Sequence, residues 1–351
     1  MPERGKSTAP REWDNDTTEL GGTVKASLVD RGSVERLLLL AGALRSGLID
    51  ALASGEALSA EHVALVAGTD PEASRIILEA LAEEGLVQRV LESEDGAFYA
   101  LSPLGKAHLV DEGPEMERSA LLHRVNRLRG WLELPEVIRT GKPTPRDPGQ
   151  RDVRSMVSAM GERDPEVVEE IVGLCLRLAG EIRTMLDVGG AVGHVARQFS
   201  RRGVKATLLD RDDVLPIARE FLGDEAAAVT MIAGDYTVSL PPGPFDLVYF
   251  GNVYHIYGPE TNARVAREAL SIATPGGLIA IQDYVWGRSQ GAAMFAVNML
   301  QATADGGVWT EGQYREWLGA AGFVNVDVLD LKNSGAQLVI GQRPGAATRK
   351  V

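Results

Sequence analysis

An aspartate and several glycines follow an apolar segment in the second half of the chain, where they could hold a small ligand. The segment 185–188 contains Asp187, and the stretch that begins there has the spacing Asp-x-Gly-x-Ala-x-Gly, with Gly189, Ala191 and Gly193. Glycine lets a backbone turn sharply and approach a ligand closely, because it has no Cβ. The spacing differs from the Gly-x-Gly-x-x-Gly of nicotinamide-binding enzymes. Alone, it predicts either a ligand-binding turn or a plain connection from strand to helix.

Three more polar side chains follow predicted strands. Asp210 ends the second strand, 23 positions after Asp187, where a carboxylate accepts hydrogen bonds from both hydroxyls of a ribose. Asp235 follows the third strand, where it could accept from an adenine amino group, and His255 follows the fourth. Ligands of an open parallel sheet bind at the carboxyl ends of its strands. One acid there could be a helix cap, but four such strand ends together indicate a nucleotide-like ligand.

The elements that must position these residues alternate between strand and helix from residue 184 onward, as in a parallel α/β sheet. Two strands near the C-terminus are close enough in sequence to form a hairpin. The predicted strands are 185–188, 206–210, 230–233, 246–251, 278–283, 324–331 and 337–341. The sequence therefore predicts an α/β fold with a Rossmann-like sheet of seven strands.

Residues 58 to 105 predict a winged helix, which consists of helix, turn, helix and a two-stranded hairpin. Ser59 and Asp70 have the places of helix N-caps, and Pro71 has the first position of the second helix. The hairpin strands are predicted at 86–90 and 98–101. The buried side of the second helix is expected to consist of Ile76, Ile77, Leu78 and Leu81.

The charge of the chain argues against nucleic acid as a partner. A winged helix can place its second helix in the major groove of DNA. Here that helix carries four glutamates against one arginine, and the whole chain has a net charge of −13, whereas phosphate contacts need positive charge. A scaffold or dimerisation module is expected, with a ligand-binding regulator as the alternative. The apolar segment 34–44 needs a partner surface, which an isologous homodimer would supply.

The composition, with 44% hydrophobic and 24% charged residues, is typical of a soluble globular protein. The single cysteine, Cys175, excludes an internal disulfide and has the apolar setting of a packed helix face. No apolar run approaches the roughly 18 residues of a membrane span, and no secretory signal is apparent, so a cytoplasmic location is expected. The predicted divisions are a disordered segment 1–20, a winged-helix domain 21–105, a helical linker 106–180 and a ligand-binding domain 181–351.

The order of winged helix, helical linker and α/β sheet, with these strand-end residues, resembles the class I methyltransferases of the plant-caffeate and bacterial-antibiotic O-methyltransferase group. The resemblance covers residues 24–343. It implies S-adenosylmethionine as cofactor, S-adenosylhomocysteine as its product, no metal, and a small aromatic natural product (a secondary metabolite) as acceptor. The first domain would then mediate dimerisation, and the linker would contribute to the acceptor pocket.

The resemblance also assigns roles to individual residues. His255 matches the catalytic histidine, and Asp283 matches the position of a glutamate that orients it. The implied cofactor-binding residues are Asp187, Gly189, Ala191, Gly193, Asp210, Asp235, Tyr236 and Asn252. The implied acceptor wall includes Met156, Met160, Trp286 and Met299.

Such chemistry is consistent with a histidine at position 255. Methyl transfer to a phenol needs a phenolate, whereas a phenol has a pKa near 10. Histidine is the side chain whose unperturbed pKa suits a general base near neutrality, and a neighbouring carboxylate would fix its tautomer. The alternative is a structural histidine that caps a helix. Its place at the end of the fourth strand favours the catalytic role.

Two positions depart from the family pattern. Ala191 replaces a glycine, which costs free energy if the position needs a positive φ. Val308 and Trp309 stand where the plant enzymes have a second carboxylate beside the histidine, unless Asp305 or Glu311 substitutes for it. The alternative reactions on this scaffold are therefore C- or N-methylation, and a hydroxylation, decarboxylation or pericyclic step that does not consume S-adenosylmethionine.

Overall fold

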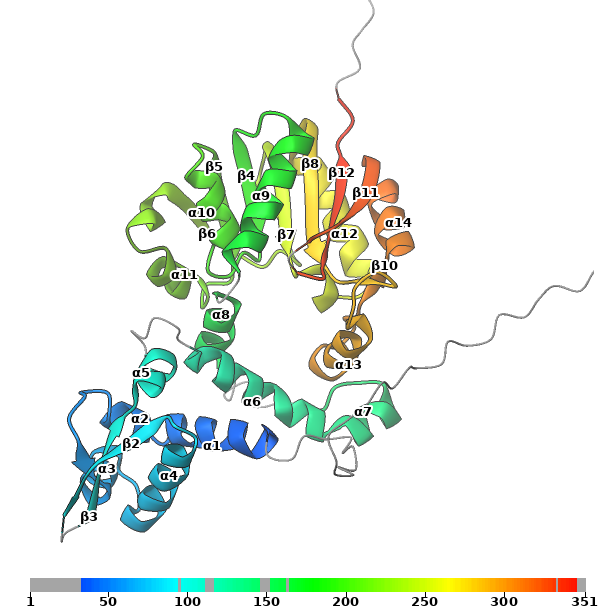
Figure 1. Ribbon diagram of the computed structural model, residues 1–351. Helices are drawn as coiled ribbons and strands as arrows, with labels where there is room; N and C mark the ends of the chain where they lie inside the picture. The colour runs from blue at the N-terminus through cyan, green and yellow to red at the C-terminus, as the bar shows by residue number, and fades with distance from the viewer. Residues whose placement is uncertain are drawn as a thin grey trace, which may run out of the picture.

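The computed structural model describes residues 33–93, 96–110, 117–145, 152–161, 164–332 and 334–345. The segment 1–20, predicted to be disordered, lies outside these residues, as does the start of the helical region predicted from Val24. The large sheet lies at one end of the molecule and the N-terminal helices at the other, with α6 (Arg118–Leu132) and α13 (Ala292–Ala302) between them (Figure 1). Within the described ranges, no helix has the length and apolarity needed to cross a membrane.

The large sheet has seven strands in the order β11-β12-β8-β7-β4-β5-β6, and all seven predicted strands are confirmed. The central strand β4 pairs in parallel with β5 on one side and with β7 on the other, whereas β12 is antiparallel to β8 and β11. The strand order reverses beside β4, so ligands are expected at its carboxyl end. The strands are β4 Thr184–Val188, β5 Lys205–Asp210, β6 Val229–Ala233, β7 Phe245–Gly251, β8 Ala273–Asp283, β11 Val324–Asp330 and β12 Gln337–Gln342.

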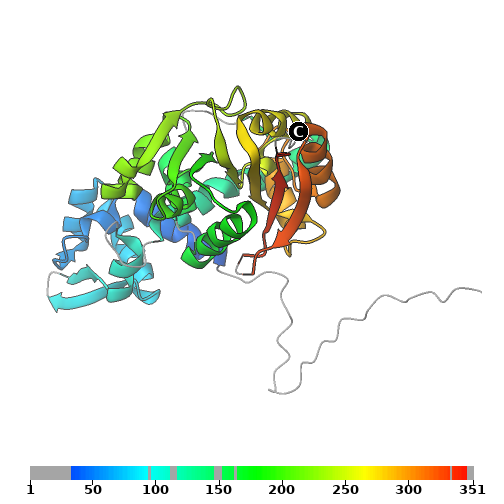
Figure 2. The same cartoon turned by 90° about the horizontal axis from the view of Figure 1, so that it is seen from above.

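Helices cover both faces of this sheet, which Figure 2 shows from above. Side chains alternate between the faces, so Met185 of β4 lies in one apolar core and Leu186 in the other. Cys175 is fully buried in the first core, where burial raises the pKa of its thiol to about 12, so its predicted packing role is confirmed. The helices are α9 Pro165–Ala179, α10 His194–Ser200 and α11 Leu215–Leu222 on the first core, with the 3-10 turn η2 Gly223–Ala228, and α12 Pro259–Ile272 and α14 Glu311–Ala321 on the second.

The N-terminal region has the predicted helix–turn–helix and hairpin. Ser59 caps α3 through the N–H of His62, Asp70 caps α4 through the N–H of Ala73, and Pro71 opens α4. A short strand, β1, was not predicted and adds a third strand to the hairpin. The elements are α1 Ser33–Arg45, α2 Leu48–Ala51, β1 Leu58–Ser59, α3 Ala60–Ala67, α4 Pro71–Glu83, β2 Val87–Ser93, β3 Gly96–Leu101 and α5 Pro103–Leu109.

One of the four residues predicted for the buried side of α4 is exposed. Leu78 and Leu81 are fully buried and Ile77 is half-buried, but Ile76 is 53% exposed, so its prediction was wrong. Residues of an α-helix are about 100° apart around the axis, which puts Ile76 roughly 200° from Leu78. A run of apolar residues therefore cannot lie wholly on one face.

The helical connection between the two ends continues through α7 (Leu134–Thr140) and α8 (Val153–Gly161). Helix α13, which belongs to the second half of the sequence, contacts α6 and α7. The 3-10 turn η3 (Tyr254–Ile256) and a two-stranded parallel ladder of β9 (Val285–Trp286) and β10 (Trp309–Thr310) were not predicted. These short elements surround His255 and the end of β8.

Candidate active site

The glycine turn lies between β4 and α10, at the carboxyl edge of the sheet. Gly189 and Gly193 have φ values of +65° and +78°, which glycine adopts without strain. Gly190 was not predicted as a site residue, yet a Cβ there would lie 2.2 Å from a methyl carbon of Leu208. The turn lines a hollow of about 270 Å³ with Met160 on α8 and other residues of the strand ends. The requirement for glycine at position 190 therefore comes from close packing, which the spacing of the motif does not indicate.

Ala191 is the strained residue of this turn. Its φ is +52°, in the left-handed region that costs an L-residue roughly 1–2 kcal/mol. The residue is nevertheless buried, and its backbone N–H donates to Oδ2 of Asp210 at 2.9 Å. The position therefore does require a positive φ, and contacts on both sides hold it there.

Two buried aspartates connect the turn to its neighbours. Asp187 is 1% exposed, and its Oδ2 accepts from the backbone N–H of Ala196, which joins β4 to α10. Asp210 accepts from the N–H groups of Ala191 and Arg211. Desolvation by burial raises the pKa of Asp210. Each of its oxygens has a further lone pair that could accept from a hydroxyl.

The next two strand ends carry the remaining predicted cofactor residues. Asp235 is exposed, and its Oδ1 accepts from the N–H and hydroxyl of Thr237. The ring of Tyr236 meets that of Tyr257 edge to face at 5.8 Å, close to the turn. Asn252 has a φ of +59°, and its N–H donates to the carbonyl of Gln282. The strand ends thus surround the turn.

His255 and Asp283 form a buried pair at the ends of β7 and β8. Nδ1 of His255 lies 2.8 Å from Oδ1 of Asp283, and the His255 backbone N–H donates to Oδ2 at 3.0 Å. Asp283 is fully buried, whereas the side chain of His255 is 11% exposed. With Nδ1–H donating to the carboxylate, Nε2 of the neutral imidazole carries a free lone pair.

The turn η3 that carries His255 is held by its neighbours through backbone carbonyls. Gly307 N–H donates to the carbonyl of His255 at 2.9 Å. Trp309 Nε1 and Asn262 Nδ2 each donate to the carbonyl of Tyr254 at 2.8 Å. These bonds hold the backbone from which the imidazole of His255 extends.

Phe295 was not predicted as a candidate site residue, although it contacts His255. Its ring meets the imidazole of His255 edge to face at 4.8 Å, and it also lies 4.6 Å from the ring of Tyr284. Phe295 precedes Met299 by four residues and so shares a face of α13 with it. That spacing was the available signal.

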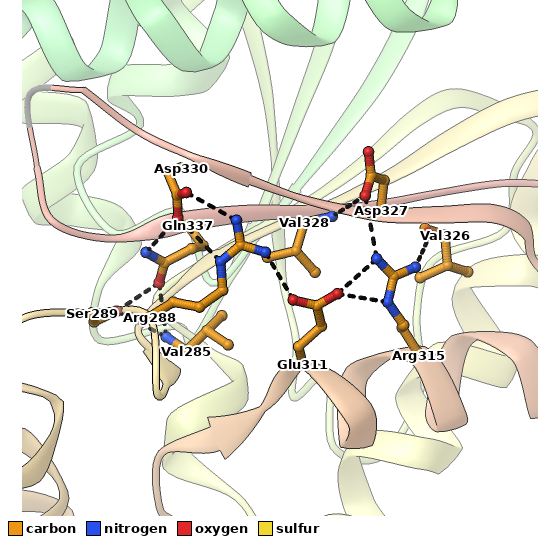
Figure 3. A network of polar contacts seen from close by, with 10 residues as sticks. All are labelled: Val285, Arg288, Ser289, Glu311, Arg315, Val326, Asp327, Val328, Asp330 and Gln337. Carbon is orange, nitrogen blue, oxygen red and sulfur yellow. Dashed lines mark hydrogen bonds and ion pairs between the residues drawn. The ribbon is translucent and has the colours of Figure 1, made fainter. Parts of the chain in front are cut away.

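Within the described part of the chain, neither Asp305 nor Glu311 is hydrogen-bonded to His255 as a second carboxylate would be. Glu311 belongs to an outer network, in which it pairs with Arg288 and Arg315, while Arg288 also pairs with Asp330 (Figure 3). The hydrogen bond from Arg315, followed by that from Arg288, lowers the pKa of Glu311. Among the described residues, Asp283 is the only acid hydrogen-bonded to the imidazole.

The four residues predicted for the acceptor wall do not all meet. Met156 and Met160 lie on α8, where Met156 packs beside Ala191 and Met160 lines the hollow at the glycine turn. Met299 is buried on α13, the helix that contacts His255 through Phe295. Trp286 is 47% exposed on β9.

Comparison with known families identifies the family to which the chain belongs. Residues 150–324 match the model of the O-methyltransferase domain, and residues 38–111 match that of the O-methyltransferase dimerisation domain. The chain belongs to the O-methyltransferase family. This methyltransferase has the family's seven-stranded mixed sheet and N-terminal helical dimerisation region, so the predicted fold class is confirmed.

Two curated relatives and one solved structure illustrate the likeness of this methyltransferase. It is 26% identical to a tetracenomycin polyketide synthesis 8-O-methyl transferase of Streptomyces glaucescens, over 84% of the chain and 89% of the relative. It is 26% identical to a 3-hydroxy-5-methyl-1-naphthoate 3-O-methyltransferase of Streptomyces sahachiroi, over 86% and 90%. Human N-acetylserotonin methyltransferase, solved with S-adenosylmethionine, superposes with a TM-score of 0.68 at 19% identity, over 89% and 94%.

The residues at the strand ends of this S-adenosylmethionine-dependent enzyme fit its cofactor. Gly189 has no side chain, and a Cβ there would lie 3.0 Å from Val253 and 3.4 Å from Tyr236, so the position requires glycine. The carboxylate of Asp210 accepts from the N–H of Ala191 in the turn, and the turn itself lines a hollow at the end of β4. These are the features that a nucleoside with an attached amino acid requires.

The strain at Ala191 generates a stability prediction. We expect Ala191→Gly to change the free energy of unfolding by less than about 1 kcal/mol, because relief of the left-handed strain offsets the greater chain entropy of glycine. Ala191→Val should destabilise by about 2 kcal/mol or more, since a branched side chain adds strain and overpacks the site. Urea unfolding measures both values. A valine variant as stable as the wild type would contradict the assigned backbone conformation.

Proposed function

We propose that the enzyme transfers a methyl group to a hydroxyl of a small aromatic natural product, with His255 as general base and Asp283 as the residue that orients it. The observation that carries this proposal is the 2.8 Å contact between Nδ1 of His255 and the buried carboxylate of Asp283. It leaves Nε2 as the proton acceptor.

The residues of the chain would divide the work as follows. His255 Nε2 takes the proton of the acceptor hydroxyl, and the negative charge of Asp283 stabilises the imidazolium that results. Phe295, whose ring packs on that of Tyr284, covers one side of the imidazole and limits the access of water. When bound, S-adenosylmethionine supplies an electrophilic methyl group on a sulfonium.

Asp210 is proposed to bind the ribose hydroxyls, and the turn 189–193 the methionine part of the cofactor. Support comes from the position of Asp210 at the end of β5, next to the turn, with two backbone donors fixing its carboxylate. Asp235, Tyr236 and Asn252 are proposed to border the adenosine. The exposed Asp235 carboxylate would accept from the adenine amino group through its Oδ2.

The acceptor is proposed to be a small aromatic molecule with one or more rings. The Streptomyces relatives act, by their names, on a tetracenomycin polyketide and on a hydroxynaphthoate. The buried Met299 and the aromatic rings of Phe295 and Tyr284 support an apolar acceptor beside His255. Met156, Met160 and Trp286 remain proposed contacts at its edges.

A different reaction on the same scaffold is the second candidate. The observation that favours it is the single carboxylate at His255, where plant relatives are expected to have two. Mass spectrometry of the product separates the cases, because O-, N- and C-methylation each add one CH₂ unit and a hydroxylation or decarboxylation does not. Fragmentation then identifies the methylated atom.

Substitution of the histidine and its partner tests the mechanism. We expect His255→Ala and Asp283→Asn each to lower kcat by about 10²- to 10⁴-fold, the usual contribution of a general base and its support. Affinity for S-adenosylhomocysteine, measured by calorimetry, should stay within about threefold in both variants. Asp210→Ala should show the opposite pattern and lose that affinity.

Glu311→Gln is the matched control for the mechanism. It removes a carboxylate of the outer network but touches neither His255 nor Asp283. Its kcat should remain within about threefold of the wild type, since exposed ion pairs contribute little. An unchanged kcat in His255→Ala would exclude His255 as the base, and a large loss in Glu311→Gln would identify the missing second acid.

We also propose a homodimer formed through the N-terminal helices. Leu38 on α1 is 49% exposed and Ile76 on α4 is 53% exposed, and an apolar hollow lies between these helices. Exposed apolar side chains of this kind mark interaction surfaces. The match of residues 38–111 to a dimerisation domain supports the proposal.

Light scattering coupled to size exclusion tests the dimer. The wild type should elute with twice the mass of the chain at micromolar concentration. Leu38→Glu should shift it toward the monomer, because dimerisation would bury a carboxylate that has no counterion. Val238→Glu, a control at a 72% exposed position of the other domain, should leave the dimer intact. A monomeric wild type would contradict the proposal.

A further inference from the structure

Arg127 on α6 is a half-buried cation that no carboxylate neutralises in the described part of the chain. Other arginines, such as Arg118, Arg201 and Arg264, each lie within 2.6 Å of a carboxylate oxygen. Arg127 instead donates from Nε to Oδ1 of Asn298 at 3.2 Å. Desolvation and the neighbouring Arg124 lower the pKa of its guanidinium. A charge that is partly withdrawn from water without a counterion destabilises the protein unless a ligand supplies one.

The amide of Asn298 fixes Arg127 without neutralising it. Asn298 is 6% exposed, and its Oδ1 also accepts from Nε2 of Gln301 at 2.9 Å. The contact uses Nε of Arg127, so its two terminal NH₂ groups have no hydrogen-bond acceptor among the described residues. Two parallel N–H donors of a guanidinium match the two oxygens of a carboxylate.

The position of Arg127 relates it to the proposed reaction site. Asn298 follows Phe295 by three residues on α13, an advance of about 4.5 Å along the helix axis. Phe295 in turn contacts the imidazole of His255. In Figure 1, α13 lies between the sheet and α6, and α6 and α13 are in contact. An acceptor that extends from His255 along α13 would therefore present its distal edge to this guanidinium.

We propose that Arg127 determines acceptor specificity by binding a carboxylate on the acceptor ring, at the edge opposite the reacting hydroxyl. The proposal rests on the function proposed above and narrows its acceptor to aromatic hydroxy acids. Arg127 takes no part in proton or methyl transfer. It selects and orients the acceptor so that the hydroxyl, not the carboxylate, lies at Nε2 of His255.

Matched acids and esters test this specificity. The probes are 4-hydroxybenzoic acid and a hydroxynaphthoic acid, each compared with its methyl ester, which keeps the ring and hydroxyl but removes the charge. The wild type should prefer the acid in kcat/KM. Arg127→Gln should lower the ratio of acid to ester by about 10- to 100-fold, the usual value of a charged hydrogen bond. Arg127→Lys should restore part of it, because lysine keeps the charge but not the fork.

Arg124→Gln is the matched control, since Arg124 is an exposed cation one turn earlier on α6 and is not hydrogen-bonded to Asn298. Its acid-to-ester ratio should stay within about threefold of the wild type. Equal use of acid and ester by the wild type would overturn the proposal. So would an Arg127→Gln variant that loses activity on both probes alike, because that pattern indicates a structural role.

A binding measurement separates this proposal from the proposed reaction. Calorimetry with S-adenosylhomocysteine present can use the methoxy forms of the same acids and esters, which cannot react. Suppose that the wild type binds the acid more tightly than the ester, that Arg127→Gln abolishes this preference, and that no probe is methylated. This result would support the acid site and contradict the reaction. Methylation of the esters alone, with no acid bound by the wild type, would support the reaction and overturn the acid site.

Discussion

The buried carboxylate of Asp283 is the constraint on which the active site depends. It is fully buried and must therefore be satisfied by donors inside the protein. Three N–H groups meet it, from the backbone and ring of His255 and from the backbone of Tyr284. One charge thus fixes the end of β8, the turn η3 and the start of the next loop. Gln337 and Arg288 hold that loop against β12 and β11, as Figure 3 shows.

Much of the fold could be predicted because its signals are local. Seven apolar runs gave seven strands, and Ser59 and Asp70 cap helices as their positions indicate. Ile76 was wrongly predicted to be buried, because an apolar residue on a helix does not by itself indicate which face of the helix is covered. β9 and β10 were not predicted because two-residue strands have no periodicity.

Candidate residues could be named from the sequence where a polar side chain follows a strand, as for Asp210 and His255, and their roles stay predictions. The site was not predictable where two distant segments meet. Arg127 and Asn298 are 171 positions apart, and nothing in either local sequence indicates the other. Ala191 is a third case: the sequence showed that alanine replaces glycine there, but it could not predict the φ of +52°. Strain of this kind is tolerated where the surrounding contacts over-determine the backbone.

The central claim is that Asp283 sets the tautomer of His255 and leaves Nε2 free to accept a proton. Nitrogen-15 NMR of histidine-labelled protein, with His255→Ala used to assign the signal, measures this directly. We expect the neutral imidazole of His255 to show a protonated Nδ1 and an unprotonated Nε2 in the wild type, and this preference to be lost in Asp283→Asn. A protonated Nε2 in the wild type would contradict the account, because that nitrogen could not then act as the base.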